Sequence, residues 1–171
     1  MNKSQGFILM EVSVVMVIVC LVLTGFYDNI TGMLMNLNRV KEDVELYRVK
    51  RVIMANIASA IQYDSQKVTV VPGKFGSILK ADKWGQRRTV RYYRNEVPNS
   101  PGLYGLYQSR QVKGKQEGIN PLCPITVDVC KWNIKLLNAT TVELAIVLRA
   151  LPGTREREFR EIVELGNGYV Y

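Results

Sequence analysis

The chain has 171 residues, of which 47% are hydrophobic, and a formal net charge of +8 at pH 7. This length supports one globular domain and leaves no room for a second, because domains usually occupy about 100 to 150 residues. The excess of basic residues favours an anionic surface, an acidic partner subunit or nucleic acid as a partner, and it selects none of them. The chain has no histidine, nucleophile motif or Gly-rich phosphate loop, so we expect a protein that is not an enzyme and binds no cofactor or metal.

An apolar run lies close to the N-terminus, from Phe7 to Leu23. It contains no basic residue and is about long enough to cross a hydrocarbon core, so it predicts a membrane span. Glu11 lies inside this run, where an ionised carboxylate is costly and needs a partner or a proton. The leader before it, residues 1–6, carries Lys3, which is expected on the cytoplasmic side and directs the C-terminus outward.

Gly6, Phe7 and Glu11 at this spacing, after a short basic leader, resemble the N-terminus of the type IV pilin-like proteins. The resemblance implies cleavage between Gly6 and Phe7 by prepilin peptidase and N-methylation of Phe7. It further implies a single pass through the cytoplasmic (inner) membrane, a C-terminal domain exported to the periplasm or cell surface, and assembly with other pilin or pseudopilin subunits through Glu11. A plain signal-anchored membrane protein that carries a glutamate is the alternative.

One helix is predicted from Phe7 to about Tyr63, because no proline occurs before Pro72. Its first half, residues 7–28, is the expected membrane segment. Its second half, residues 29–63, has apolar residues at steps of three and four, which predicts an amphipathic helix packed on a globular domain. A coiled coil with a partner helix is the competing use of this stripe. The stripe consists of Leu37, Val40, Val44, Tyr47, Ile53, Ile57 and Ile61.

Beyond this helix the period becomes alternating, so residues 64–171 are predicted to form an exported β-rich domain. The expected fold class is α+β, a long N-terminal helix packed on a C-terminal antiparallel sheet, which is also the architecture that the resemblance implies. Val142, Leu144, Ile146 and Leu148 form the predicted core face of one strand. Strands are expected at residues 67–71, 89–94, 103–109, 132–137, 141–148 and 158–165, with the second and third paired as a hairpin.

The order of these strands is similar to that of the J-type minor pseudopilins and the tip-region minor pilins. The similarity is carried by Val90-Arg91-Tyr92-Tyr93-Arg94 and Leu106-Tyr107, although Gln108 lies where relatives tend to have an arginine. It implies a minor structural subunit of a type IV pilus, a type II secretion system or a competence filament. The alternative is a membrane-tethered binding module whose exported domain captures DNA, a secreted protein or a surface.

Two of the three cysteines, Cys123 and Cys130, lie in the part expected in an oxidising compartment. This location favours a disulfide between them, with a reduced structural pair as the alternative. Cys20 lies in the apolar run, where a thiol behaves as a small hydrophobic group. The spacing is not that of a metal site.

A group of basic residues next to tyrosines is the one candidate for nucleic-acid contact, because basic side chains bind phosphates and aromatic rings stack on bases. Strand alternation places Tyr92 on the face opposite Arg91 and Tyr93, so we prefer a cross-strand tyrosine ladder with Tyr104 and Tyr107 to DNA contact. The basic residues are Arg87, Arg88, Arg91 and Arg94.

Overall fold

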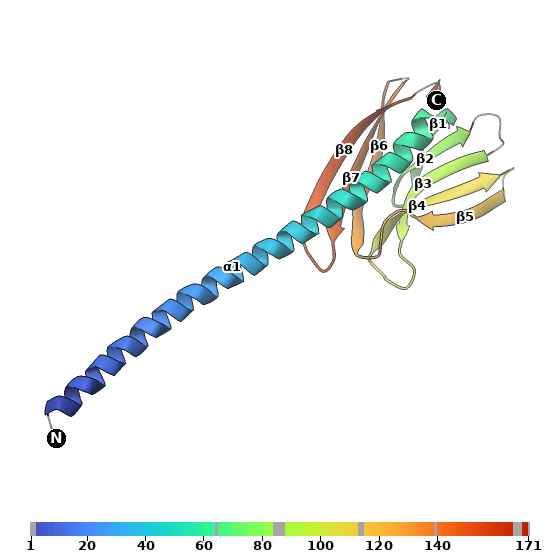
Figure 1. Ribbon diagram of the computed structural model, residues 1–171. Helices are drawn as coiled ribbons and strands as arrows, with labels where there is room; N and C mark the ends of the chain where they lie inside the picture. The colour runs from blue at the N-terminus through green and yellow to red at the C-terminus, as the bar shows by residue number, and fades with distance from the viewer. Residues whose placement is uncertain are drawn as a thin grey trace. The chain divides into compact units, whose positions relative to one another are not determined.

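The computed structural model describes residues 3–63, 65–83, 88–112, 115–138, 140–165 and 169–170, with side chains for all of these except 3–9, 116–117 and 169–170. One helix, α1 (Lys3–Gln62), is followed by β-strands (Figure 1). The strands are β1 (Ser65–Gly73), β2 (Gly76–Lys83), β3 (Arg88–Glu96), β4 (Tyr104–Val112), β5 (Lys115–Pro121), β6 (Val127–Asn138), β7 (Thr141–Ala150), β8 (Glu156–Glu164) and β9 (Tyr169–Val170). The predicted α+β fold, a long N-terminal helix packed on antiparallel β-sheets, is confirmed.

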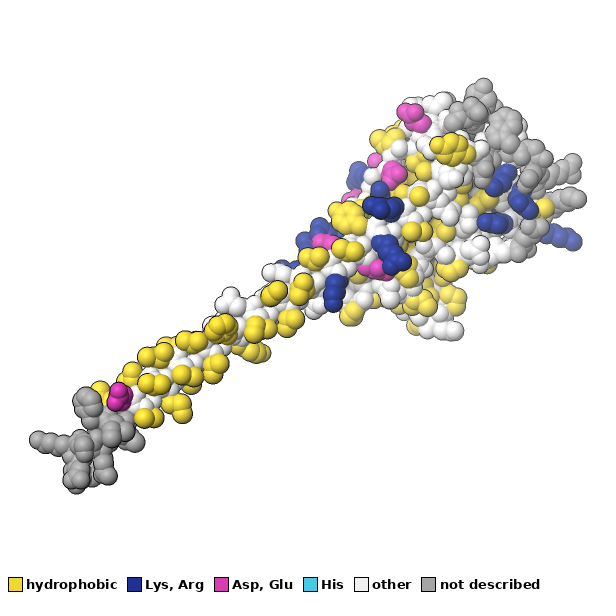
Figure 2. Space-filling model, in the orientation of Figure 1, with side chains coloured by type: hydrophobic (Ala, Val, Ile, Leu, Met, Phe, Trp, Pro, Cys, Tyr) yellow, Lys and Arg dark blue, Asp and Glu magenta, His cyan; other side chains and the backbone are white. Residues whose placement is uncertain are grey.

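The chain divides into two compact units, Met1–Lys41 and Glu42–Tyr171. In the described part of the first unit, α1 is the only element, and its large apolar side chains from Met10 to Leu37 are 45–71% exposed. Part of α1 is long and apolar enough to cross a membrane, and it is the single candidate span in the part of the chain that the structure describes. Figure 2 shows this dense apolar covering in yellow.

The second unit combines the C-terminal part of α1 with two sheets. The larger sheet has the strand order β5-β4-β3-β2-β1-β9, and the smaller has the order β6-β7-β8. All neighbouring strands are antiparallel except β1 and β9, which are parallel. The predicted hairpin between the second and third expected strands is confirmed as β3 and β4, in register from Arg88 opposite Val112 to Glu96 opposite Tyr104.

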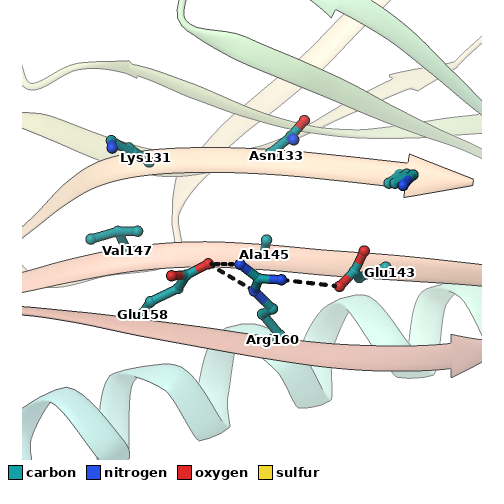
Figure 3. Close-up of a pocket in the computed structure, with 8 residues that line it drawn as sticks. Lys131, Asn133, Glu143, Ala145, Val147, Glu158 and Arg160 are labelled. Atoms are coloured by element: carbon teal, nitrogen blue, oxygen red, sulfur yellow. Dashed lines mark hydrogen bonds and ion pairs between the residues drawn. The ribbon is translucent and has the colours of Figure 1, made fainter.

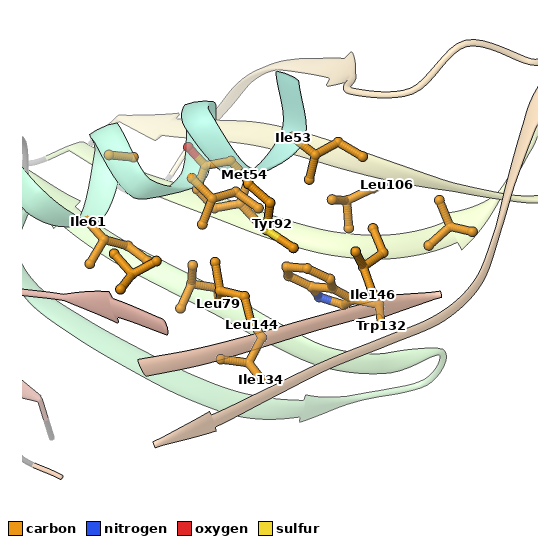
Figure 4. Packing of buried hydrophobic residues seen from close by; sticks show 14 of the residues in the cluster. Ile53, Met54, Ile61, Leu79, Tyr92, Leu106, Trp132, Ile134, Leu144 and Ile146 are labelled. Carbon is orange, nitrogen blue, oxygen red and sulfur yellow. The ribbon is translucent and has the colours of Figure 1, made fainter. Parts of the chain in front are cut away.

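The C-terminal part of α1 and both sheets share one hydrophobic core (Figure 4). Ile53, Ile57 and Ile61 of α1 are fully buried, as are Leu79 and Tyr92 of the larger sheet. The core face predicted for β7 is confirmed, because Val142, Leu144, Ile146 and Leu148 are each 0% exposed.

The buried face of α1 differs in phase from the predicted stripe. Leu46 and Val49 are buried, whereas Tyr47 is 60% exposed and Val44 is 62% exposed. The prediction joined two stripes across the six-residue step from Tyr47 to Ile53, which is not a whole number of helical turns. The residues of the predicted stripe that remain exposed are Leu37, Val40, Val44 and Tyr47.

Strand β6 begins at Val127, earlier than the predicted start at residue 132. The prediction missed its first part because a β-bulge interrupts the alternation of buried residues. The pairing with β7 shifts between Val129 and Lys131, which leaves Cys130 without a partner residue. Before the bulge Val127 and Val129 are buried, and after it Trp132 and Ile134 are buried. A bulge inserts one residue and so exchanges the two faces of the strand.

A ladder of three contacts fastens β8 to α1. Three helix residues, spaced by four and then three positions, share one face of α1. They contact every second residue of β8, and these strand residues share one face of the strand. The first pair is a bidentate ion pair, with N–O distances of 3.0 and 2.9 Å, and its hydrogen bonds lower the pKa of the Asp43 carboxyl. The second pair is aromatic, edge to face at 5.3 Å, and the third is an ion pair at 2.5 Å. The pairs are Asp43 with Arg157, Tyr47 with Phe159, and Lys50 with Glu161.

The edge of β6 contacts the larger sheet. Arg94 of β3 donates through Nε to the carbonyl of Val129 at 2.6 Å, and the Ser77 hydroxyl donates to Asn133 Oδ1 at 3.0 Å. Gly76 has a φ of 124°, and a Cβ there would lie 2.5 Å from the carbonyl oxygen of Trp132. Any larger residue would clash with this carbonyl, so glycine is required where β2 passes close to β6.

The core packing of α1 predicts a contrast between two residues five positions apart. Replacing the fully buried Ile57 by alanine leaves a cavity and should lower the free energy of unfolding by about 2–5 kcal/mol. Val52→Ala removes methyl groups from a side chain that is 53% exposed, and should change the free energy of unfolding by about 0.5 kcal/mol or less. Chemical unfolding of both variants measures the difference, and equal losses would contradict this packing.

Candidate assembly and binding sites

Glu11 is the only charged residue between Lys3 and Asp28. It lies in α1 among exposed apolar neighbours, including Met10, which is 68% exposed, and Val15, which is 54% exposed. It makes no hydrogen bond or ion pair with any residue whose side chain the structure describes. A carboxylate in an apolar environment needs such a partner or a proton.

Three other polar side chains of this helical segment form hydrogen bonds within the helix itself. Thr24, Asn29 and Thr31 each donate to the backbone carbonyl four residues earlier, at 2.7 to 2.8 Å. Such bonds allow polar residues to enter an apolar environment without an unpaired donor. Glu11 differs from these residues because no backbone donor within the helix is free to bind it.

The predicted processing residues, Gly6 and Phe7, belong to α1, but their side chains lie outside the described residues. The processing site therefore remains a prediction from the sequence.

The basic residues suggested for nucleic-acid contact do not form one surface. Arg88 and Arg94 are on the same face of β3 as the buried Val90, whereas Arg91 is on the opposite face. Arg87 lies outside the described residues. The guanidinium of Arg94 is already engaged, because it binds the Val129 carbonyl and stacks 3.9 Å from the ring centre of Tyr104.

The tyrosine ladder is confirmed in part. Tyr93 and Tyr107 are directly opposite in the β3–β4 pair, and their rings stack with centres 6.1 Å apart. Partial burial raises the pKa of both hydroxyls. Tyr104 does not join this stack, since its ring contacts Arg94 and Phe75.

The predicted disulfide is not formed in the structure, where Cys123 and Cys130 are free thiols. Each thiol has a different hydrogen-bond partner in the structure. Cys123 Sγ accepts from the Leu106 amide at 3.1 Å, and Cys130 Sγ donates to Asp128 Oδ2 at 3.6 Å. Burial raises the pKa of Cys123 to about 11 and that of Cys130 to about 12.

Asp128 is a buried polar centre that the sequence pattern did not indicate. It is 3% exposed, its Oδ1 accepts from the Tyr104 amide at 2.9 Å, and its Oδ2 accepts from Arg149 at 2.5 Å. A buried carboxylate is tolerated when it is paired and hydrogen-bonded in this way. Asp128 therefore joins β4, β6 and β7.

The outer face of the smaller sheet has a hollow of about 340 Å³ (Figure 3). Its floor is the small residue Ala145 of β7. On one side Arg160 donates twice to Glu158 at 2.8 Å and lies 4.0 Å from Glu143. On the other side Lys131 of β6 makes no ion pair with the residues that the structure describes. Because Arg160 is neutralised by two carboxylates, the hollow has a mixed charge and favours no particular class of ligand.

No protein-family model, curated protein or solved structure matches this chain.

The environment of the thiols predicts slow alkylation. Because only the thiolate reacts, a pKa of about 11 instead of 9 slows the reaction of Cys123 roughly a hundredfold below pH 9. Intact mass after iodoacetamide treatment without reductant should show almost no addition at these two cysteines in the native state. All three cysteines should be modified in denaturant. A linked Cys123–Cys130 peptide would contradict the free thiols.

Proposed function

We propose that this protein is a minor pilin or pseudopilin, a structural subunit of a type IV pilus, type II secretion or competence filament. The observation that carries the proposal is Glu11, a single carboxylate without a partner among the described side chains of an exposed apolar helix. The Gly6-Phe7 junction before it supports the same function through its resemblance to the prepilin leader.

The proposed role of Glu11 follows from the charge that processing creates. Cleavage between Gly6 and Phe7 produces a new ammonium group at Phe7, in a bundle of apolar helices that contains almost no water. A neighbouring subunit that is staggered by about one turn places its terminus beside Glu11, since four residues rise about 6 Å along a helix. Leaving either charge buried alone costs about 3–5 kcal/mol, so the pair sets the register between subunits.

The same proposal places the chain in the cytoplasmic (inner) membrane before assembly. α1 supplies the single candidate span, and Lys3 at its N-terminal side favours an exported C-terminal domain. Prepilin peptidase and other pilin or pseudopilin subunits are the partners that this function requires.

Processing is tested first by intact mass of the membrane fraction. The proposal predicts a mature chain that begins at Phe7 and carries an added methyl group. Gly6→Leu should retain the six-residue leader, because a bulky side chain replaces the one residue without a side chain before the apolar run. A wild-type chain that begins at another residue would reject the assignment.

Assembly is tested with Glu11→Gln, which keeps the shape of the side chain and removes its charge. Its incorporation into sheared filaments, quantified by mass spectrometry, should fall about a hundredfold or more, as expected from 3–5 kcal/mol. Asp28→Asn is the matched control, because it neutralises the next carboxylate on the same helix, and should assemble normally. If Glu11 is merely protonated in the bilayer, Glu11→Gln will behave as wild type and the register role is wrong.

A further inference from the structure

The outer face of the smaller sheet consists of alternate side chains of β6, β7 and β8. On this face the residues of β8 and those of β6 after its bulge are exposed, and those of β7 are half-buried. The side chains on the opposite face of β7 belong to the core that the sheet shares with α1. The outer face is therefore the side of the sheet that another molecule can reach.

Charge on this outer face is separated between the two edges of the sheet. After its bulge β6 contributes two basic residues, whereas β8 contributes three acidic residues and one basic residue. The central strand contributes one residue of each sign, Glu143 and Arg149. The face as a whole is neutral, because the basic edge and the acidic edge cancel. The edge residues are Lys131 and Lys135 on β6, and Glu156, Glu158, Arg160 and Glu164 on β8.

The strand register aligns two of these opposite charges in one row. Lys131 of β6 is paired with Val147 of β7, and Val147 is paired with Glu158 of β8. Figure 3 shows the three side chains following one another across the sheet. The backbones of Lys131 and Glu158 are about 10 Å apart, because two strand spacings separate them. The row therefore has a positive end, an apolar centre and a negative end.

Both ends of this row can bind a further charged group. Lys131 is exposed and makes no ion pair with the residues that the structure describes. Glu158 is bound by Arg160 through one oxygen only, since Nε and an Nη of Arg160 both lie 2.8 Å from Oε1. Each oxygen of a carboxylate can accept hydrogen bonds, so Oε2 of Glu158 can accept one from another molecule.

We infer that this face binds the same face of a second copy of the chain. A two-fold axis parallel to the strands places β6 of one copy over β8 of the other, so that the basic edge meets the acidic edge twice. An axis across the strands places β6 over β6 and β8 over β8, where like charges repel. The charge distribution therefore selects the axis parallel to the strands.

The row of Lys131, Val147 and Glu158 defines the register of this pair. With the axis along β7, Val147 of one copy faces Val147 of the other. Lys131 of each copy then lies over Glu158 of its partner, because the rotation exchanges the two ends of the row. The central strand presents Ala145 and Val147 near the axis, and these uncharged side chains allow the sheets to pack at the usual separation of about 10 Å.

The direction of α1 supports the same axis. The contacts of Asp43 with Arg157 and of Lys50 with Glu161 show that β8 runs in the same direction as this part of α1. Rotation about an axis parallel to β8 keeps that direction, so both chains leave the second unit at Glu42 toward the same side. Two chains whose candidate spans enter one membrane require this arrangement, whereas the axis across the strands would reverse one of them.

The size of the face predicts a weak pair. Three strands cover about 14 Å by 30 Å, which is about 400 Å² per copy and half of a standard interface. The hollow over Ala145 faces its counterpart and leaves space for water. Confinement of both chains to one membrane raises their effective concentration and compensates for this weakness. The inference goes beyond filament assembly, because a two-fold pair is closed whereas a filament grows through head-to-tail contacts.

The test is energy transfer between full-length chains that carry a donor or an acceptor fluorophore at the C-terminus, in phosphatidylcholine vesicles. The wild type should show transfer above the level of random encounters at the same protein-to-lipid ratio. Lys131→Glu alone and Glu158→Lys alone should each lower the association constant about tenfold, because two attractive contacts become repulsive. The matched control is Lys115→Glu, the same change at an exposed position of β5, which should leave the transfer unchanged.

Two combinations of the variants should restore pairing. The first is Lys131→Glu with Glu158→Lys in one chain, which exchanges the two charges and keeps the net charge of the wild type. The second is a mixture of donor-labelled Lys131→Glu chains and acceptor-labelled Glu158→Lys chains, in which one contact is exchanged and the other is that of the wild type. Restored transfer also shows that the single variants fold.

Transfer at the random level in the wild type would overturn the inference, because the face would then not be a contact between copies. Equal losses in Lys115→Glu and Lys131→Glu would assign the attraction to net charge alone. A failure of both combinations to restore transfer would rule out contact between β6 and β8. The proposed function would stand after any of these results, since Glu11→Gln tests it separately.

Discussion

The burial of one face of α1 between two sheets is the interaction on which the second unit depends. The sheets share a core whose central residues, such as Ile53 and Ile57, come from the helix. The larger sheet has no strand in common with the smaller one, and they are joined directly by a few edge contacts such as Arg94 with the Val129 carbonyl. Without the helix, Leu79 and Leu144 would lose part of the buried apolar cluster that they share with Ile53 and Ile57.

The same helix meets two environments, and its sequence changes where they change. Before Lys41 apolar side chains are exposed around the helix, and the polar Thr24, Asn29 and Thr31 bind its own backbone. From Glu42 onward one face carries Asp43 and Lys50, which bind β8, and another face is buried from Leu46. This division explains why a change at Glu11 is expected to affect assembly, while a change at Ile57 is expected to affect folding.

The sequence predicted the fold class, the core face of β7 and the β3–β4 hairpin, because each depends on a local and regular period. It missed β2 and β5, since β2 has few β-branched residues and β5 is mostly polar. The bulge at Cys130 hid the first part of β6 by reversing the alternation of buried residues. Asp128 could not be recognised from sequence because its partners Tyr104 and Arg149 are distant in the chain.

The site predictions also succeed where they depend on a local pattern and fail where they depend on contacts between distant segments. Glu11 stands out because one charge interrupts a regular apolar pattern, whereas the contacts of Arg94 with the Val129 carbonyl and the Tyr104 ring combine separate strands that only the fold brings together. The arginines that are close in sequence, Arg91 and Arg94, point to opposite faces. Proximity in the sequence therefore does not show that basic residues share one surface.

Hydrogen–deuterium exchange of the full chain in detergent micelles tests most directly whether the helix holds the two sheets together. If it does, the amides of residues 46–61 and those of Thr141–Ala150 will exchange through the same opening, with the same free energy. Protection of β7 that persists when residues 46–61 exchange freely would contradict this account.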